Sequence, residues 1–116
     1  MFLTDARIRI IVSCHYEKDR INREDFIREH LGGDGYVVDG FVVDRNHPHG
    51  EEVHSLTDKG IIIIHNLMSG RLCTKLIARK NQVKRYYETT GREKPPEYED
   101  ILKLAEEHEK LGYHKI

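Results

Sequence analysis

Cationic side chains recur at every fourth position from Arg71 to Arg79, in a stretch whose residue types favour a β-strand. Successive side chains of a strand point to opposite faces, so Arg71, Lys75 and Arg79 are predicted to share one face with Cys73 and Ile77. A guanidinium group holds a phosphate through paired hydrogen bonds, and this face therefore suits a phosphodiester. The other face is predicted to pack on a core and carries Leu72, Thr74, Leu76 and Ala78.

Two histidines are candidates for proton transfer near these cations. His65 follows four consecutive isoleucines and is predicted to lie on the cationic face of the neighbouring strand, and His54 belongs to the strand before it. An imidazole titrates near neutral pH and can accept the proton of a ribose 2′-hydroxyl. The sequence does not rank the two histidines.

The segment that follows the cationic strand is also basic. It interleaves Lys80, Lys84 and Arg85 with Tyr86 and Tyr87, whose rings are candidates to stack on unpaired bases. The whole chain has a net charge of −1, but residues 71–94 contain eight Lys and Arg against two Asp and Glu. This uneven distribution predicts a polyanionic partner, RNA in the first place, whereas the alternative is an ordinary solvated surface.

A histidine-rich stretch offers a less favoured metal site. Imidazoles and carboxylates in one loop can bind zinc, but proline within a His-Pro-His sequence makes adjacent side chains diverge. The candidate ligands of this less favoured site are His47, His49 and His54, with Asp44 and Glu52 nearby in the sequence. The main prediction is a solvated turn-forming loop, no metal and no cofactor.

Periodicity predicts an α+β fold in which these residues are positioned by a four-stranded antiparallel meander. We expect one domain over residues 1–116, with an N-terminal helical segment and two C-terminal helices. Residues 4–13 fit a helix, with a strand at 7–12 as the alternative. The other predicted elements are a helix at 22–31, strands at 37–43 with a bulge at Gly40, 52–57, 60–67 and 71–79, a helix at 81–90, and a last helix from Pro95-Pro96 to Leu111 with the buried stripe Ile101, Leu104, Ala105, His108 and Leu111.

Composition fits a globular protein of the cytoplasm that does not enter a membrane. The 116 residues are 38% hydrophobic and 34% charged, and the longest aliphatic run is only Ile61 to Ile64. The N-terminal residues lack the order typical of a signal peptide. Cys14 and Cys73 form no CxxC motif, so reduced thiols are expected.

The stretch from Gly60 to Arg79, with its strand, turn, strand pattern and its His, Lys and Arg side chains, resembles the core of the metal-independent ribonuclease toxins of the barnase, colicin and RelE-type group. The chain is also similar to small phage and mobile-element proteins of unknown function. The toxin resemblance implies an endoribonuclease with His65 or His54 as general base. It also implies that Lys75 and Arg79 stabilise the phosphorane and that Arg71 positions the phosphate.

The resemblance further implies an inhibitor or a host protein as a partner, and a homodimer is left open. The alternative function is a non-enzymatic module that binds nucleic acid or an acidic protein surface through the same basic residues.

Overall fold

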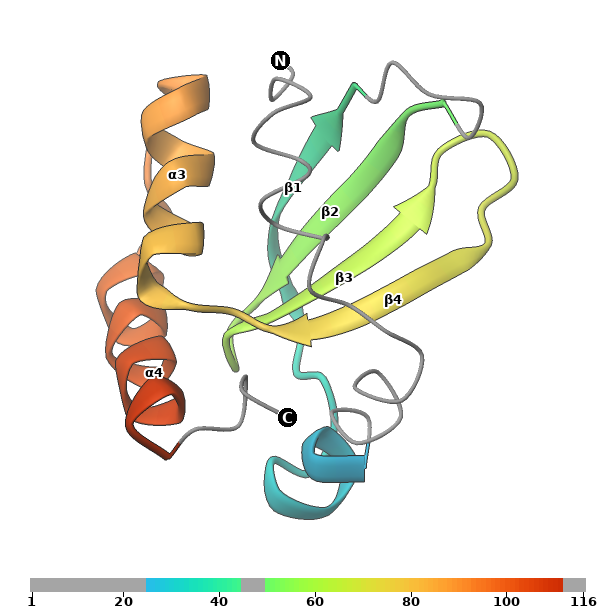
Figure 1. Ribbon diagram of the computed structural model, residues 1–116. Helices are drawn as coiled ribbons and strands as arrows, with labels where there is room; N and C mark the ends of the chain where they lie inside the picture. The colour runs from blue at the N-terminus through green and yellow to red at the C-terminus, as the bar shows by residue number, and fades with distance from the viewer. Residues whose placement is uncertain (1–24, 45–49, 112–116) are drawn as a thin grey trace.

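The protein folds as an antiparallel sheet with helices before and after it in the chain (Figure 1). The structure is a computed structural model that describes residues 25–44 and 50–111. Residues 25–30 are helical, and the sheet has the strand order β1-β2-β3-β4. The labelled elements are β1 (Val37–Val43), β2 (Glu52–Thr57), β3 (Ile61–Asn66), β4 (Leu72–Ile77), α3 (Lys80–Thr90) and α4 (Tyr98–Leu111).

This architecture confirms the predicted α+β fold with its four-stranded meander and two C-terminal helices. The described part of the predicted helix 22–31 is helical over residues 25–30. The element predicted within residues 4–13 lies outside the described residues. In the described part of the chain, no helix combines the length and the apolar character that crossing a bilayer requires.

The turn between β2 and β3 follows from its side chains. Gly60 has a φ of 75°, a left-handed conformation that glycine adopts without steric cost. The buried Thr57 hydroxyl accepts hydrogen bonds from the backbone N–H groups of Lys59 and Ile61, at 3.3 and 3.2 Å. The turn is therefore closed by its own donors and acceptors, and it sets the register of the two central strands.

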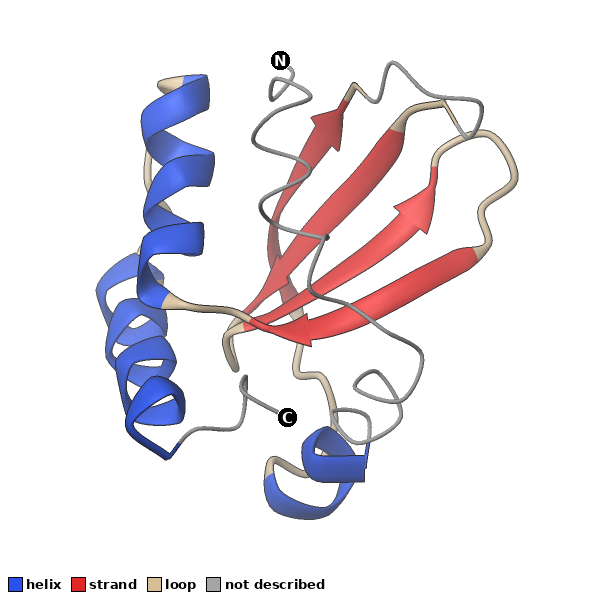
Figure 2. Ribbon diagram, in the orientation of Figure 1, coloured by secondary structure: helices blue, strands red, loops and turns tan. Residues whose placement is uncertain are grey.

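The main hydrophobic core lies between one face of the sheet and the pair α3 and α4, which stand together beside the sheet (Figure 2). It contains Phe41, Leu56, Ile62, Ile64, Leu76, Val83, Tyr86, Tyr87 and Ile101, among others. A smaller cluster on the other face joins Phe26 and Ile27 of the helical residues 25–30 to Ile61 and Ile77. The sheet is therefore packed on both faces.

The sheet has two register shifts, and neither lies at the predicted position, Gly40. Gly40 pairs regularly with Ser55, and the register of β1 shifts between Val37 and Asp39 instead. The predicted bulge at Gly40 is therefore wrong. A second shift, between Ile64 and His65 on β3, faces the start of β4.

The second shift changes which side chains of β4 meet the core. Thr74 pairs with Ile64, but Leu72 pairs with His65, so one extra β4 residue reverses the alternation. Leu72 is exposed, while the partly buried Cys73 packs against the main core. The predicted faces of Leu72 and Cys73 are wrong for this reason, whereas the core positions of Leu76 and Ala78 are confirmed.

The last helix buries a stripe close to the predicted one. Ile101, Ala105 and His108 are buried as expected, together with Tyr98 and Leu102. Leu104 is only partly buried, and Leu111 is exposed at the end of the helix. The first three turns of α4 therefore contact the core more closely than its last turn does.

Candidate nucleic-acid interface

Lys75, the cation within β4, is held by a carboxylate of the same chain. Its Nζ lies 2.8 Å from Asp34 Oδ2, and both side chains are partly buried. A partly shielded ion pair of this length keeps the ammonium group directed at Asp34. A phosphate would have to compete with that carboxylate for Lys75.

The structure brings His65 and Lys75 to one face of the sheet but spreads the arginines apart. Lys75 pairs with Ile63, and His65 follows two residues after Ile63 on the same side of β3. Arg71 and Arg79 are exposed just beyond the two ends of β4, about 25 Å apart at the rise of an extended chain. Of the predicted catalytic set, the strand register therefore places His65 and Lys75 on one face of the sheet.

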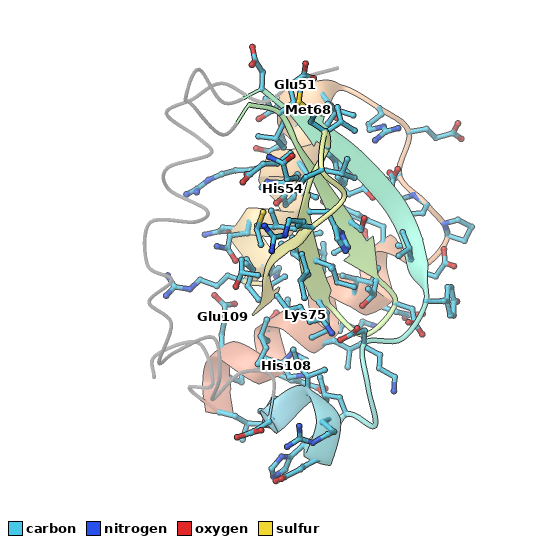
Figure 3. The ribbon with its side chains drawn as sticks, turned by 90° about the vertical axis from the view of Figure 1, so that its right-hand side faces the viewer. Glu51, His54, Met68, Lys75, His108 and Glu109 are labelled. Atoms are coloured by element: carbon cyan, nitrogen blue, oxygen red, sulfur yellow. The ribbon has the colours of Figure 1, made fainter. Side chains whose placement is uncertain are left out.

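His54 lies on the opposite face, fully buried in the main core between β2 and α3 (Figure 3). Its Nε2 is 3.2 Å from Glu52 Oε1, and its Nδ1 is 2.7 Å from the hydroxyl of Tyr86. Burial, followed by the charge of Glu52, raises the pKa of Tyr86 far above its ordinary value, so the hydroxyl keeps its proton.

The His54 ring is therefore hydrogen-bonded at both nitrogens, to Glu52 through Nε2 and to Tyr86 through Nδ1. This chain of hydrogen bonds joins strand β2 to helix α3 inside the core. The burial of His54 contradicts the solvent-accessible position that a general base acting on RNA requires.

Tyr86 and Tyr87 are core residues and present no ring face to a base. Both rings are buried, and they pack on Phe41 with centroid distances of 4.6 and 5.3 Å. The Tyr87 hydroxyl donates to Asp39 Oδ2 at 3.0 Å. The expected accessibility of these rings is therefore wrong. Their spacing with Val83 and Thr90, at i, i+3, i+4 and i+7, is the signal in the sequence that indicates a buried stripe.

Two lysines of α3, Lys80 and Lys84, line an open groove of about 550 Å³ between α3 and α4. Lys80, Lys84 and Glu88 come from α3, and Lys94 comes from the loop that joins the helices. The side of α4 that faces the groove carries Tyr98, Glu99, Leu102, Lys103 and Glu106. Because Tyr98 and Leu102 are almost fully buried, they form the floor, and the charged residues form the rims.

Among the residues that the structure describes, three of the four lysines in the groove have no carboxylate partner. Lys80 Nζ lies 3.1 Å from Glu106 Oε2, and this contact, followed by the charge of Lys110, lowers the pKa of Glu106. Lys94 Nζ stands 4.9 Å from the centroid of the Tyr98 ring. Within residues 25–44 and 50–111, no carboxylate lies within 4 Å of the ammonium groups of Lys84, Lys94 or Lys103.

Lys94 and Lys103 were not predicted from the sequence as parts of this site. Lys103 belongs to an acidic helix, and Lys94 lies next to the proline break, so neither has a local signal. Lys94 and Lys103 line the same groove as Lys84 because α3 packs on α4. Arg85 is half-buried on α3 outside the groove lining, and exposed Arg79 precedes α3, where its backbone N–H donates to Gln82 Oε1 at 2.8 Å.

The histidine-rich stretch adds no metal centre to the parts of the chain that the structure describes. His47 and His49 lie outside the described residues, and His54 is in the core. Among the residues described, no three His, Cys, Asp or Glu side chains are arranged to hold a metal ion.

The chain matches no protein-family model, and neither a curated protein nor a solved structure is significantly similar to it. The resemblance to ribonuclease toxins therefore stays a prediction.

Proposed function

We propose that this protein binds RNA through the groove between α3 and α4 and contacts the sugar-phosphate backbone. The observation that supports the proposal best is the set of three lysines, Lys84, Lys94 and Lys103, whose ammonium groups have no carboxylate partner in the described structure. An ammonium group is a strong point charge for phosphate oxygens, and it carries no information about base sequence.

The composition of the groove also sets the kind of binding. Its rims carry four lysines against three glutamates, and both tyrosines of α3 are buried. Binding therefore depends on counterion release more than on base stacking, with modest affinity and little sequence preference. Each lysine that contacts a phosphate contributes about −0.7 to the slope of log K against log salt for a single strand.

Fluorescence anisotropy with a labelled single-stranded RNA, over a series of salt concentrations, tests the proposal. We expect the triple variant Lys84→Gln, Lys94→Gln, Lys103→Gln to bind more weakly and to lower the steepness of the salt slope by about 2. Arg28→Gln is the matched control, because Arg28 is an exposed cation on the helical residues 25–30, outside the groove. A duplex DNA of equal charge shows whether the groove prefers RNA.

Two results would contradict the proposal. The first is a wild-type protein that does not bind RNA at low salt. The second is a triple variant that binds with the affinity and the salt slope of the wild type.

A second candidate function is metal-independent cleavage of RNA at His65. The supporting observation is the register that sets His65 and Lys75 on the same side of β3 and β4. The ion pair of Lys75 with Asp34 counts against it. Incubation with RNA in EDTA tests it: we expect cleavage that His65→Ala abolishes and that the surface control His30→Ala retains. Intact RNA with the wild-type protein would exclude this function.

A further inference from the structure

Three large apolar side chains are exposed together at the tip of the β3–β4 hairpin. Met68 is 97% exposed, and Leu67 and Leu72 are each about half exposed. The turn that presents them is held by backbone hydrogen bonds from Asn66 N–H to Arg71 O and from Gly70 N–H to Asn66 O, both 2.9 Å. Met68 is therefore held in solvent by a closed turn.

Two opposite charges flank this apolar group. Arg71 is exposed within the tip, and the carbonyl of exposed Glu51 accepts a hydrogen bond from Leu67 N–H at 3.0 Å. Figure 3 shows Glu51 beside Met68 at the same end of the sheet. In the described structure neither Glu51 nor Arg71 has an ion-pair partner. We call Leu67, Met68, Leu72, Glu51 and Arg71 together the hairpin-tip patch.

The other exposed apolar residues do not form such a group around a turn. Tyr36 and Val37 lie at the start of β1, where the Tyr36 hydroxyl bonds to Glu97, and Leu111 ends α4. Single apolar residues on a surface are ordinary, whereas a contiguous group with a polar rim indicates an interaction site. The hairpin tip is the place where such a group forms among the described residues.

The charges of the patch indicate the kind of partner. A polyanion would be attracted by Arg71 but repelled by Glu51, so the patch differs from the lysine groove in its chemistry. A surface with an apolar centre and one charge of each sign is complementary to itself. When two copies meet across a twofold axis, residue i of one contacts residue j of the other, and the reverse contact forms as well.

We propose that two copies of this chain associate through their hairpin-tip patches. In the dimer, Met68 packs on the apolar residues of the second copy, and Glu51 of each chain pairs with Arg71 of the other. The interaction is weak, because the apolar centre consists of three side chains, far fewer than in obligate dimers. It does not depend on RNA binding, since none of the five residues lines the groove.

Sedimentation equilibrium of the full chain, up to about 1 mM protein, measures the association. We expect the wild type to form dimers in a concentration-dependent way and Met68→Glu to raise the dimer Kd by about tenfold or more. Leu111→Glu is the matched control, because it adds the same charge at an exposed leucine elsewhere and should leave the Kd unchanged.

A charge swap tests the twofold arrangement itself. Glu51→Arg and Arg71→Glu each set like charges against each other, and each should raise the Kd by about tenfold. The double variant restores opposite pairs across the axis and should recover the wild-type Kd, a result that no change in folding alone would produce.

The proposal is overturned by a wild type that stays monomeric at the highest concentration. It is also overturned by a dimer that Met68→Glu leaves intact, or by a double swap that is no better than the single ones.

Discussion

Replacing Tyr87 by phenylalanine distinguishes a tyrosine that supports the fold from one that stacks on RNA bases. The substitution keeps the aromatic ring and removes only the hydroxyl. A stacking residue on the surface would tolerate it without loss of stability. In the structure the ring is 2% exposed, and its hydroxyl donates to Asp39 Oδ2 at 3.0 Å.

The magnitude follows from what the hydroxyl contacts. Burial, followed by the charge of Asp39, raises the pKa of Tyr87, so the hydroxyl remains a donor at all ordinary pH values. A hydrogen bond to a charged group contributes about 1.5–3 kcal/mol. Asp39 keeps its contact with Arg92 Nη1 at 3.2 Å and is not fully buried, which offsets part of the loss. We therefore expect the free energy of unfolding to fall by about 1–2 kcal/mol, near 5 °C in Tm.

Urea denaturation followed by circular dichroism measures this change, and Tyr36→Phe is the matched control. The Tyr36 hydroxyl also donates to a carboxylate, Glu97 Oε2 at 3.3 Å, but its side chain is 59% exposed. Loss of that exposed bond should cost less than about 0.5 kcal/mol. Equal losses in the two variants, or an unchanged stability of Tyr87→Phe, would refute the assignment of Tyr87 to the core.

Three further predictions concern backbone strain, charge competition and pH. Gly35→Ala should cost about 2 kcal/mol in urea denaturation, because Gly35 has a φ of 84° and a Cβ would overlap a carboxylate oxygen, whereas Gly40→Ala should change stability by less than about 0.5 kcal/mol. Glu106→Gln releases Lys80 and should raise the RNA affinity in anisotropy titrations by about threefold at low salt. Burial lowers the pKa of His108, so the unfolded chain binds its proton more readily and stability should fall as the pH decreases from about 7 to 5. Denaturation of His108→Leu over the same pH range should show a weaker dependence.

Most of the fold could be predicted because its signals are local. The alternation of Val37 to Val43, the glycine turn at Gly60 and the proline break before the last helix act within a few residues. The strands and helices accordingly lie within a few residues of their predicted bounds. The bulges could not be located in this way, because the register shift at Ile64 and His65 is a property of two paired strands.

The candidate site was predicted less well, since a cationic side chain carries no local sign of its partner. The sequence placed Lys75 and Lys80 in one basic segment, but their carboxylates, Asp34 and Glu106, are 41 and 26 residues away. Only packing decides that these two ammonium groups are paired and that Lys84 has no carboxylate partner in the described part of the chain. The burial of Tyr87 had a signal in its helical spacing, which the interleaving with cations obscured.

The sequence by itself determined the meander, the ends of the helices and the concentration of positive charge between residues 71 and 94. The tertiary structure alone decided which of those charges are available to a ligand and joined Lys103 of an acidic helix to them in one groove. The physical reason is the distance along the chain over which each kind of interaction acts. Backbone preferences and side-chain periodicity act over a few residues, whereas ion pairing and burial depend on which distant segments pack together.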